Sequence, residues 1–237
     1  MYSSETFYSR FAKSYAQYAT TKQAYLSSVN TFIKQEAGTV KTMVDVGSGD
    51  GKRSKEIANL LGIDNFTLID NSDGMVNLSK NIPGATILKD DISNAEFKLE
   101  NKYDVVLCLW NVLGHIVFDR RVNALKNLAS LVNDKGFIFL DVNNRYNAVH
   151  YGIKATLKNI CKDILTPKIS NGDFELNINT DQGQINTVVH IFNPNETKHL
   201  FKLAGLKVLK TEIINYKTGE EKSNFWSGQL IYKLAKI

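Results

Sequence analysis

The stretch Val44-Asp45-Val46-Gly47-Ser48-Gly49-Asp50-Gly51 decides the fold. A short apolar run ends in alternating glycines, and a helical pattern follows over residues 52–61. Glycines at a strand-to-helix turn let a ligand approach the backbone, and the first turn of the helix offers free N–H groups. The sequence therefore predicts an α/β fold that binds a nucleotide-containing ligand at this turn.

The spacing and charge of this stretch narrow the ligand further. The dinucleotide fingerprint G-x-G-x-x-G requires its third glycine at position 52, which is Lys52 in this chain. Asp45 and Asp50 place carboxylates at the turn, where they would repel a pyrophosphate and favour a cation. These features point to S-adenosylmethionine, which carries a sulfonium and an ammonium and no phosphate.

Composition indicates a folded chain rather than a disordered or membrane-spanning one. The 237 residues include 43% hydrophobic residues and three prolines, which suits one domain with an elaboration. No apolar run approaches the roughly 20 residues that span a bilayer, and the first residues do not resemble a signal peptide. The two cysteines, Cys108 and Cys161, form no disulfide framework. We therefore expect a cytoplasmic protein with no membrane partner and no metal site.

Strand and helix signals alternate along the chain. The predicted strands cover residues 42–46, 66–70, 86–89, 103–110, 136–142, 206–215 and 228–234. The predicted helices cover residues 4–36, 52–61, 73–80, 119–132 and 195–204. This alternation predicts an α/β fold with a doubly wound, mainly parallel sheet, whose ligand lies beyond the carboxyl ends of the strands.

Two segments are predicted to elaborate this single domain of residues 1–237. Residues 1–36 form a helical lid with a repeating aromatic face. Residues 143–192 interrupt the alternation and are predicted to form a small inserted α+β cap over the acceptor site. In this cap we expect a helix over 148–165 and strands over 173–179 and 185–192, joined at the turn Asp181-Gln182-Gly183.

Together these features resemble the class I S-adenosylmethionine-dependent methyltransferases, strongly over residues 40–142 and more loosely over the last helix and hairpin. The resemblance implies a Rossmann-like seven-stranded sheet of order 3-2-1-4-5-7-6 with the seventh strand antiparallel. It also implies S-adenosylmethionine as methyl donor and S-adenosylhomocysteine as product.

The resemblance assigns cofactor contacts along the first half of the chain. The glycine turn meets the cofactor through its backbone, and Asp45 helps to hold the methionine ammonium. Asp70 accepts the ribose hydroxyls, and Asp90 accepts the adenine amino group, while the N–H of Asp91 meets the ring. Helix capping by Asp70 and core packing by Met75 are the structural alternatives. The predicted cofactor residues are Asp45, Gly47, Ser48, Gly49, Asp70, Asn71, Met75, Asp90, Asp91 and Leu109.

The segment that follows the fourth predicted strand is where the family places the acceptor. It contains no [D/N/S]-P-P-[Y/F] motif, and Cys108 is followed by Leu109 rather than proline, which argues against DNA amino and cytosine C5 methylation. The run Gly114-His115-Ile116 resembles small-molecule N-methyltransferases, such as those acting on amino sugars. His115 is predicted to act as a general base or to orient the acceptor, with helix-start packing as the alternative.

Further side chains are predicted to surround the acceptor. Trp110 is a candidate cation–π wall for the sulfonium, and Tyr18 of the leading helix is a candidate to hydrogen-bond the acceptor. Arg145 is a candidate clamp for a substrate carboxylate or phosphate. Core packing is the alternative for the aromatic residues. The predicted catalytic residues are His115 and Tyr18, and the predicted substrate residues are Tyr15, Trp110, Asn111, Arg145 and His190.

Three functions remain open at this stage. The first is methyl transfer by direct in-line displacement to a small-molecule acceptor, at an amine nitrogen. The second is RNA methylation, for example of tRNA, which the basic flanks favour: residues 1–41 and 151–237 carry net charges of +3 and +4, and residues 42–150 carry −2. The third is a non-catalytic cofactor-binding protein. Lys154, Lys158 and Lys162 share one helix face, which is either solvated or a surface for an anionic polymer.

Overall fold

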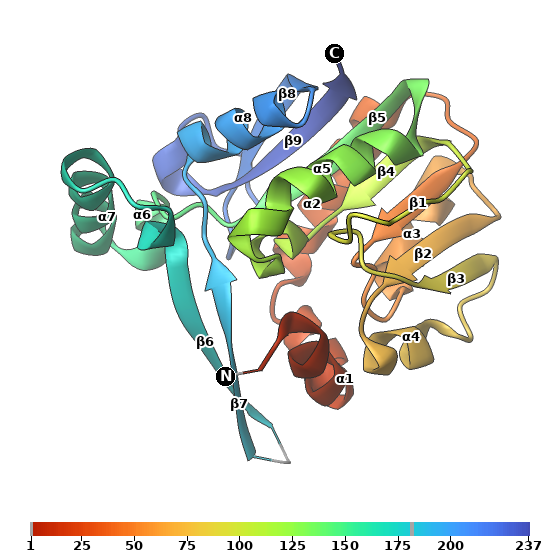
Figure 1. Cartoon of the computed structure of the whole chain (residues 1–237), viewed down its shortest axis with the longest axis horizontal. Helices are drawn as coiled ribbons and strands as arrows, with labels where there is room; N and C mark the ends of the chain where they lie inside the picture. The colour runs from red at the N-terminus through yellow and green to blue at the C-terminus, as the bar shows by residue number, and fades with distance from the viewer. Residues whose placement is uncertain (1, 181–182) are drawn as a thin grey trace.

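Seven strands form one mainly parallel sheet in the computed structural model, which describes residues 2–180 and 183–237 (Figure 1). In spatial order they are β3 (Ala85–Lys89), β2 (Phe66–Asp70), β1 (Met43–Val46), β4 (Tyr103–Cys108), β5 (Val132–Val142), β9 (Gln229–Lys236) and β8 (Leu206–Ile214). β9 pairs antiparallel with both β5 and β8. Because β8 and β9 are the sixth and seventh strands of this sheet along the chain, the predicted order 3-2-1-4-5-7-6 is confirmed.

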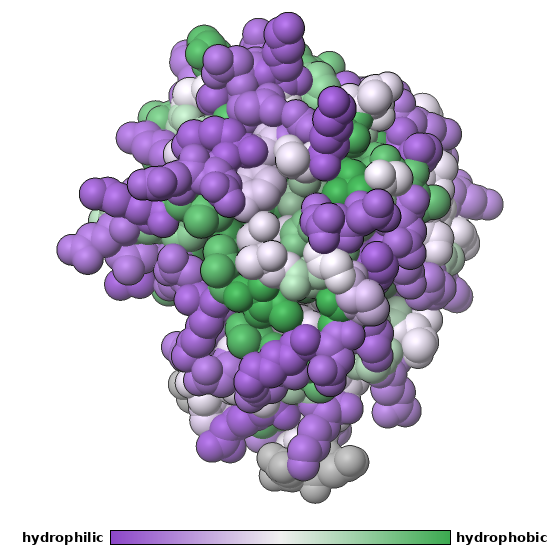
Figure 2. Space-filling model, turned by 90° about the vertical axis from the view of Figure 1, so that its right-hand side faces the viewer, coloured by the Kyte–Doolittle hydropathy of each residue, from purple (hydrophilic) through white to green (hydrophobic). Residues whose placement is uncertain are grey.

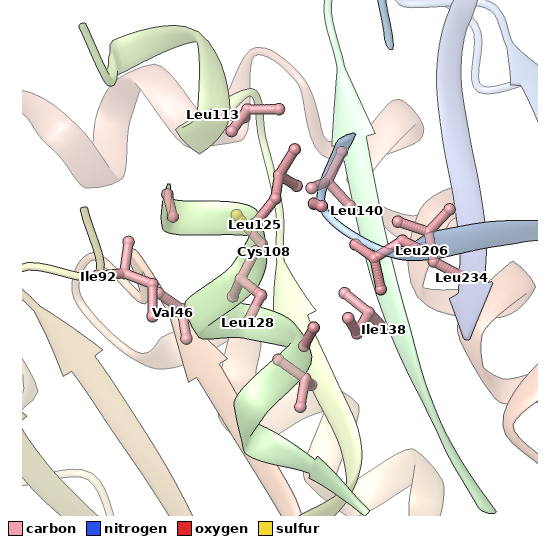
Figure 3. Packing of buried hydrophobic residues seen from close by; sticks show 14 of the residues in the cluster. Val46, Ile92, Cys108, Leu113, Leu125, Leu128, Ile138, Leu140, Leu206 and Leu234 are labelled. Atoms are coloured by element: carbon pink, nitrogen blue, oxygen red, sulfur yellow. The ribbon is translucent and has the colours of Figure 1, made fainter. Parts of the chain in front are cut away.

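Helices cover both faces of this sheet. On one face, α5 (Phe118–Leu131) and α8 (Pro194–Leu203) pack against strand residues such as Val106, and Figure 3 shows Leu125 and Leu128 of α5 beside Cys108. On the other face, α2 (Gln23–Ala37) and α3 (Lys52–Leu61) pack against residues such as Val105. A strand covered on both faces buries consecutive side chains, which explains the nearly continuous apolar sequence of β4.

The amino-terminal segment forms two helices rather than the single helix predicted over 4–36. α1 (Ser4–Thr20) and α2 are separated at Thr21 and Lys22. Thr21 donates both its N–H and its hydroxyl to the carbonyl oxygen of Tyr18, at 3.1 and 2.7 Å. This local hydrogen bonding competes with continuation of the helix, so α1 ends here and α2 begins as a separate helix.

The inserted segment contains two short helices and a separate two-stranded sheet. Gly152, with φ +86°, separates α6 (Ala148–Tyr151) from α7 (Ile153–Leu165), where one helix was predicted over 148–165. β6 (Asp173–Thr180) and β7 (Gly183–His190) pair antiparallel, and Asp181 and Gln182 of the predicted turn lie outside the described residues. The 3-10 turns are η1 (Val112–His115), η2 (Ile169–Gly172) and η3 (Phe225–Ser227).

α1 joins the inserted hairpin to the cofactor half of the sheet (Figure 1). Its Phe7 and Phe11 form a buried cluster with Ile185 of β7. On its other side, the hydroxyl of Ser9 lies 3.0 Å from that of Ser72, the cap of α4 (Asp73–Ser79). The helix therefore bridges α4 and β7 beside the carboxyl ends of the parallel strands.

One face of the molecule is mainly hydrophilic. Figure 2 shows the side of the molecule on which β3 forms the sheet edge, with a hydrophobic area in the middle of a hydrophilic face. Among the residues that the structure describes, no helix combines the length and apolar character needed to cross a bilayer.

Candidate active site

A cavity of about 640 Å³ lies where β1 and β4 meet, the point at which the strand order reverses. This position is where open α/β sheets bind ligands, and the volume lies within the ~300–1,000 Å³ of typical ligand pockets. The predicted site residues that line the cavity are Gly47, Gly49, Asp70, Asn71, Met75, Asp90, Asp91, Leu109, Trp110, Asn111, His115, Tyr15 and Tyr18. The fold thus brings together side chains from α1 and from the ends of four strands.

The glycine turn after β1 requires glycine for both conformation and space. Gly47 has φ +72°, and a Cβ atom there would lie 2.5 Å from Cγ2 of Val112. Gly49 has φ +59°, and its Cβ would lie 2.8 Å from the hydroxyl of Tyr15. The N–H groups of Gly47 and Ser48 donate to the carbonyl oxygen of Ile69, at 2.8 and 3.2 Å, which fixes the turn to β2. The turn therefore presents bare backbone at the cavity wall.

Asp45 is a buried carboxylate beneath this turn, and neither it nor Ser48 lines the cavity, contrary to the expectation from sequence. Its Oδ2 accepts a hydrogen bond from the hydroxyl of Ser54 at 2.6 Å, and its Oδ1 has no partner among the described residues. Burial raises the pKa of Asp45 from 3.8 to about 6. Because an unsatisfied buried carboxylate oxygen is costly, this position suits the ammonium of a bound ligand, reached directly or through water.

Asp70 ends β2 and faces the cavity. Its Oδ2 accepts from the N–H of Gly49 and its Oδ1 from the N–H of Ser72, both at 2.9 Å. Each carboxylate oxygen keeps a free lone pair, which suits two neighbouring hydroxyl groups. Burial raises the pKa of Asp70. The α4 cap belongs to Ser72, whose hydroxyl accepts from the N–H of Met75, so Asp70 is not needed for capping.

Asn71, Met75, Asp90, Asp91 and Leu109 complete the cofactor half of the cavity wall. Met75 and Leu109 are also buried hydrophobic residues. Asp90 accepts a hydrogen bond from the N–H of Asp91 at 2.7 Å, and both residues sit at the turn after β3.

The segment after β4 has a strained backbone. β4 ends at Cys108 instead of continuing to residue 110, because Trp110 and Asn111 both adopt φ +62°. The buried carboxylate of Asp141 at the end of β5 accepts from the N–H of Trp110, and from that of Asn111 at 3.3 Å. It also accepts from the hydroxyl of Tyr25 at 2.5 Å. Left-handed conformations cost about 1–2 kcal/mol for non-glycine residues, so Asp141 holds a turn that would otherwise relax.

This turn places Trp110 among tyrosines. Its ring is stacked on that of Tyr18 at 5.8 Å and meets that of Tyr15 edge-on at 5.6 Å. Its indole N–H donates to the hydroxyl of Tyr216 at 3.2 Å. Aromatic faces attract cations, so this wall suits a sulfonium or an ammonium.

The Asn111 side chain joins β5 to β7, because its Oδ1 accepts from the N–H of Asn143 and its Nδ2 donates to the His190 carbonyl.

His115 lies at the end of η1 and contacts α1. Its Nε2 is 2.9 Å from the hydroxyl of Tyr8, and its buried Nδ1 has no partner among the described residues. Burial lowers the pKa of His115 from 6.5 to about 4. The imidazole is therefore neutral at physiological pH and keeps one nitrogen able to accept a hydrogen bond; which nitrogen does so depends on the tautomer.

Arg145 and His190 are not at the cavity, contrary to the expectation from sequence. Arg145 pairs with Asp163 at 2.8 Å and with Glu196 at 2.7 Å. The His190 ring lies between Asp173, 2.6 Å from Nδ1, and Glu196, 2.7 Å from Nε2. Neither residue lines the cavity described above. Both side chains are buried, and their ion pairs join the inserted segment to α8. The guanidinium of Arg145 and the ring nitrogens of His190, which were expected to meet a substrate, are therefore already paired with carboxylates.

The structure adds residues that the sequence analysis missed. Tyr8, Tyr151 and Tyr216 line the cavity, and Asp141 supports its floor. Arg53 at the start of α3 has a buried Nη2 without a partner among the described residues. A lone acid in the apolar stretch Gly136–Val142 was a usable signal for Asp141, because a buried carboxylate needs donors. The tyrosines had no such signal, since their contacts depend on how distant elements pack.

Comparisons with known proteins agree with this geometry. Residues 43–136 match the family model of the methyltransferase domain. A search of curated protein sequences finds no match. Among solved structures, an S-adenosylmethionine-dependent methyltransferase from Clostridium acetobutylicum superposes with TM-score 0.65 at 14% identity, covering 97% of this chain and 98% of that one.

Two further similar structures are of methyltransferases whose names state their acceptor. The amino pentose methyltransferase CalS10 from Micromonospora echinaspora, bound to S-adenosylmethionine, gives TM-score 0.61 at 12% identity, covering 93% of this chain and 95% of that one. The glycopeptide N-methyltransferase MtfA, complexed with S-adenosylmethionine, gives TM-score 0.62 at 10% identity, covering 90% and 94%. At these identities the likeness shows the fold.

The fold and the glycine turn define a Rossmann-like class I methyltransferase. The family match over residues 43–136 identifies a methyltransferase domain in this part of the chain, so the protein is an enzyme, and the methyl donor S-adenosylmethionine predicted from the sequence agrees with this match.

Proposed function

We propose that this enzyme methylates an amine nitrogen of a small molecule. The observation that carries the proposal is the chamber around Trp110, Tyr15 and Tyr18, which is walled by aromatic rings and lies between α1 and the end of β4. An aromatic chamber favours a compact amine that attacks as the neutral base and gains positive charge as the methyl group passes from sulfur to nitrogen, whereas a polynucleotide needs a basic, open groove. The names of two structural neighbours, an amino pentose methyltransferase and a glycopeptide N-methyltransferase, point the same way.

In this proposal the cofactor is held by the residues predicted from the glycine turn and the strand ends. Asp45 meets the methionine ammonium, Gly47, Ser48 and Gly49 offer backbone, and Asp70 accepts the ribose hydroxyls. Asn71, Met75, Asp90, Asp91 and Leu109 surround the adenosine. S-adenosylmethionine supplies a methyl group activated by a positively charged sulfur, so the protein needs no group to activate the leaving thioether.

The remaining side chains act on the acceptor. Tyr18 and Trp110 hold the amine in line with the methyl group, and Tyr15 and Asn111 complete the wall. His115 orients the acceptor by accepting a hydrogen bond from its N–H group. Its lowered pKa favours this orienting role over storage of a proton, because the imidazolium is disfavoured where the ring lies. The lid of residues 1–36 and the cap of residues 143–192 exclude water from the chamber.

Two measurements test the proposal in sequence. Calorimetric titration with S-adenosylmethionine and S-adenosylhomocysteine establishes cofactor binding independently of the acceptor. S-adenosylhomocysteine release is then measured with primary and secondary amines, with the matched alcohols, and with tRNA. Turnover with amines alone supports the proposal. Turnover with tRNA, accompanied by salt-dependent tRNA binding, would instead assign the enzyme to RNA methylation.

A further inference from the structure

The helix α7 turns Thr156, Asn159 and Asp163 inward and leaves most of its apolar side chains exposed. Thr156 is 1% exposed, the amide of Asn159 donates to the carbonyl of Arg145 at 3.3 Å, and Asp163 pairs with the Arg145 guanidinium. On the outer side, Ile153, Leu157, Ile164 and Leu165 are 70, 51, 72 and 77% exposed. A surface helix of a soluble domain ordinarily packs its apolar stripe on the core, which most of the apolar residues of α7 do not do.

Exposed apolar residues also occur on the elements that flank α7 along the chain, Val149 on α6 and Ile169 on η2. We define the α7 face by its exposed apolar residues, which are Val149, Ile153, Leu157, Ile164, Leu165 and Ile169. Figure 1 shows α7 at the margin of the molecule, with no other described element on its outer side. A gathered set of exposed apolar side chains commonly marks an interaction surface.

The free charges of residues 148–172 are positive. Lys154, Lys158 and Lys162 are exposed and follow the apolar residues around the helix at four-residue spacing, and Lys168 lies just beyond. Residues 148–172 contain one acid, Asp163, and its carboxylate is engaged by Arg145. The apolar α7 face is therefore flanked by lysines and by no free acid.

From this combination we propose that the α7 face binds the surface of a bilayer that contains anionic lipid. An interfacial helix inserts an apolar strip among the acyl chains and places lysines at the head groups. The α7 face supplies the apolar strip, and its flanking lysines supply the positive charge. RNA would engage the lysines but leave the isoleucines and leucines in water. A second copy of the chain would cover the apolar strip but bring two sets of lysines together. The absence of a spanning run does not oppose the proposal, because an interfacial helix lies in the plane of the membrane.

The test uses the full-length protein and vesicles of phosphatidylcholine, with or without phosphatidylglycerol. Cosedimentation measures partitioning, and an environment-sensitive fluorophore on Cys161 reports burial, since Cys161 is exposed on α7 while Cys108 is buried. We expect binding to the anionic vesicles with a blue shift of the fluorophore. The variant Lys154→Gln/Lys158→Gln/Lys162→Gln should lower the partition coefficient by about 100-fold, since each lysine near an anionic surface contributes about fivefold.

A matched pair of triple variants isolates the apolar strip. Ile153→Gln/Leu157→Gln/Ile164→Gln should abolish cosedimentation, whereas Leu60→Gln/Leu78→Gln/Leu203→Gln, which changes leucines 45, 46 and 50% exposed elsewhere, should leave it unchanged. Circular dichroism and S-adenosylmethionine binding confirm that each variant is folded.

Three results would overturn the proposal. The first is the absence of cosedimentation with anionic vesicles. The second is lipid binding that survives the α7 apolar variant. The third is a dimer in analytical ultracentrifugation, or a tRNA complex, that forms in place of vesicle binding and is lost when the α7 face is changed.

Discussion

The hydroxyl of Tyr8 lies 2.9 Å from Nε2 of His115 and links α1 to the segment that follows β4. Their rings also meet nearly at right angles, with centroids 5.1 Å apart. The residue proposed to orient the acceptor is thus held by the helix proposed to close the site. Docking of α1 and positioning of His115 are therefore coupled.

We predict that His115→Ala lowers turnover while S-adenosylmethionine binding stays close to that of the wild type. The imidazole is placed on the acceptor side, and loss of correct orientation can cost about 100-fold in rate, so a loss of up to about 100-fold in turnover is expected. Tyr8→Phe, which removes only the hydroxyl, should give a smaller loss. Steady-state kinetics with an accepted amine, and calorimetry with the cofactor, measure the two effects. Unchanged turnover in His115→Ala would exclude the proposed role.

Asp70→Ala should weaken S-adenosylmethionine binding by about 1–3 kcal/mol, because it removes a charged acceptor of hydrogen bonds. Calorimetric titration measures the change. Asp73→Ala is the matched control, since Asp73 lies three residues away with a side chain 67% exposed and paired with Lys89. Equal affinities of wild type and Asp70→Ala would mean that another group accepts the hydrogen bonds of the ribose hydroxyls.

Cofactor affinity should fall as the pH is lowered through about 6. The pKa of Asp45 in the ligand-free protein is raised by burial to about 6, so below that pH the carboxyl is protonated. A bound ammonium favours the carboxylate, and binding must then release the proton, which costs up to about tenfold in affinity for each pH unit. Calorimetry between pH 5 and 8 measures this slope. Asp45→Asn should bind more weakly and lose the pH dependence, and a retained slope would assign it to another group.

Gly47 and Gly62 have the same φ of +72°, so substituting each by alanine distinguishes the cost of backbone strain from that of a steric clash. A Cβ at Gly47 would lie 2.5 Å from Val112, whereas a Cβ at Gly62 would have nothing within 4 Å. Gly62→Ala should cost about 1–2 kcal/mol of unfolding free energy through backbone strain alone. Gly47→Ala should cost more and also weaken cofactor binding, as urea denaturation and calorimetry would show. Equal costs at the two positions would mean that Val112 moves away freely.

Asp141→Ala should destabilise the protein by about 2 kcal/mol or more, because it leaves buried N–H groups of Trp110 and Asn111 without an acceptor. The strained turn should then relax and displace Trp110 from the cavity wall. Urea denaturation and Trp fluorescence measure the two effects. Asp134→Ala on the same strand is the control, since the Asp134 side chain is fully exposed. A variant as stable as the wild type would show that the turn does not depend on this carboxylate.

The sequence predicted the sheet well, for local reasons, and it predicted most of the residues that line the cofactor half of the cavity. Strand and helix periodicity located the seven strands of the main sheet, and the 66–70 strand matches β2 without adjustment. Gly47 and Gly49 could be predicted because a strand-to-helix turn with positive φ needs glycine, whereas Asp70 was predicted from the resemblance. The broken helices at Thr21 and Gly152 were missed, since each break is set by a single residue within an otherwise helical pattern.

What the sequence by itself determined is therefore the order of elements, the sheet they form and the glycine turn that lines the cavity, because these follow from interactions between residues near in the chain. Only the tertiary structure decided the acceptor side. It set Tyr8 against His115, Tyr18 against Trp110, and it enclosed Arg145 and His190 with Asp163, Asp173 and Glu196. Those contacts join segments far apart in sequence, and the electrostatics of a charged side chain depend on which partners such packing brings to it.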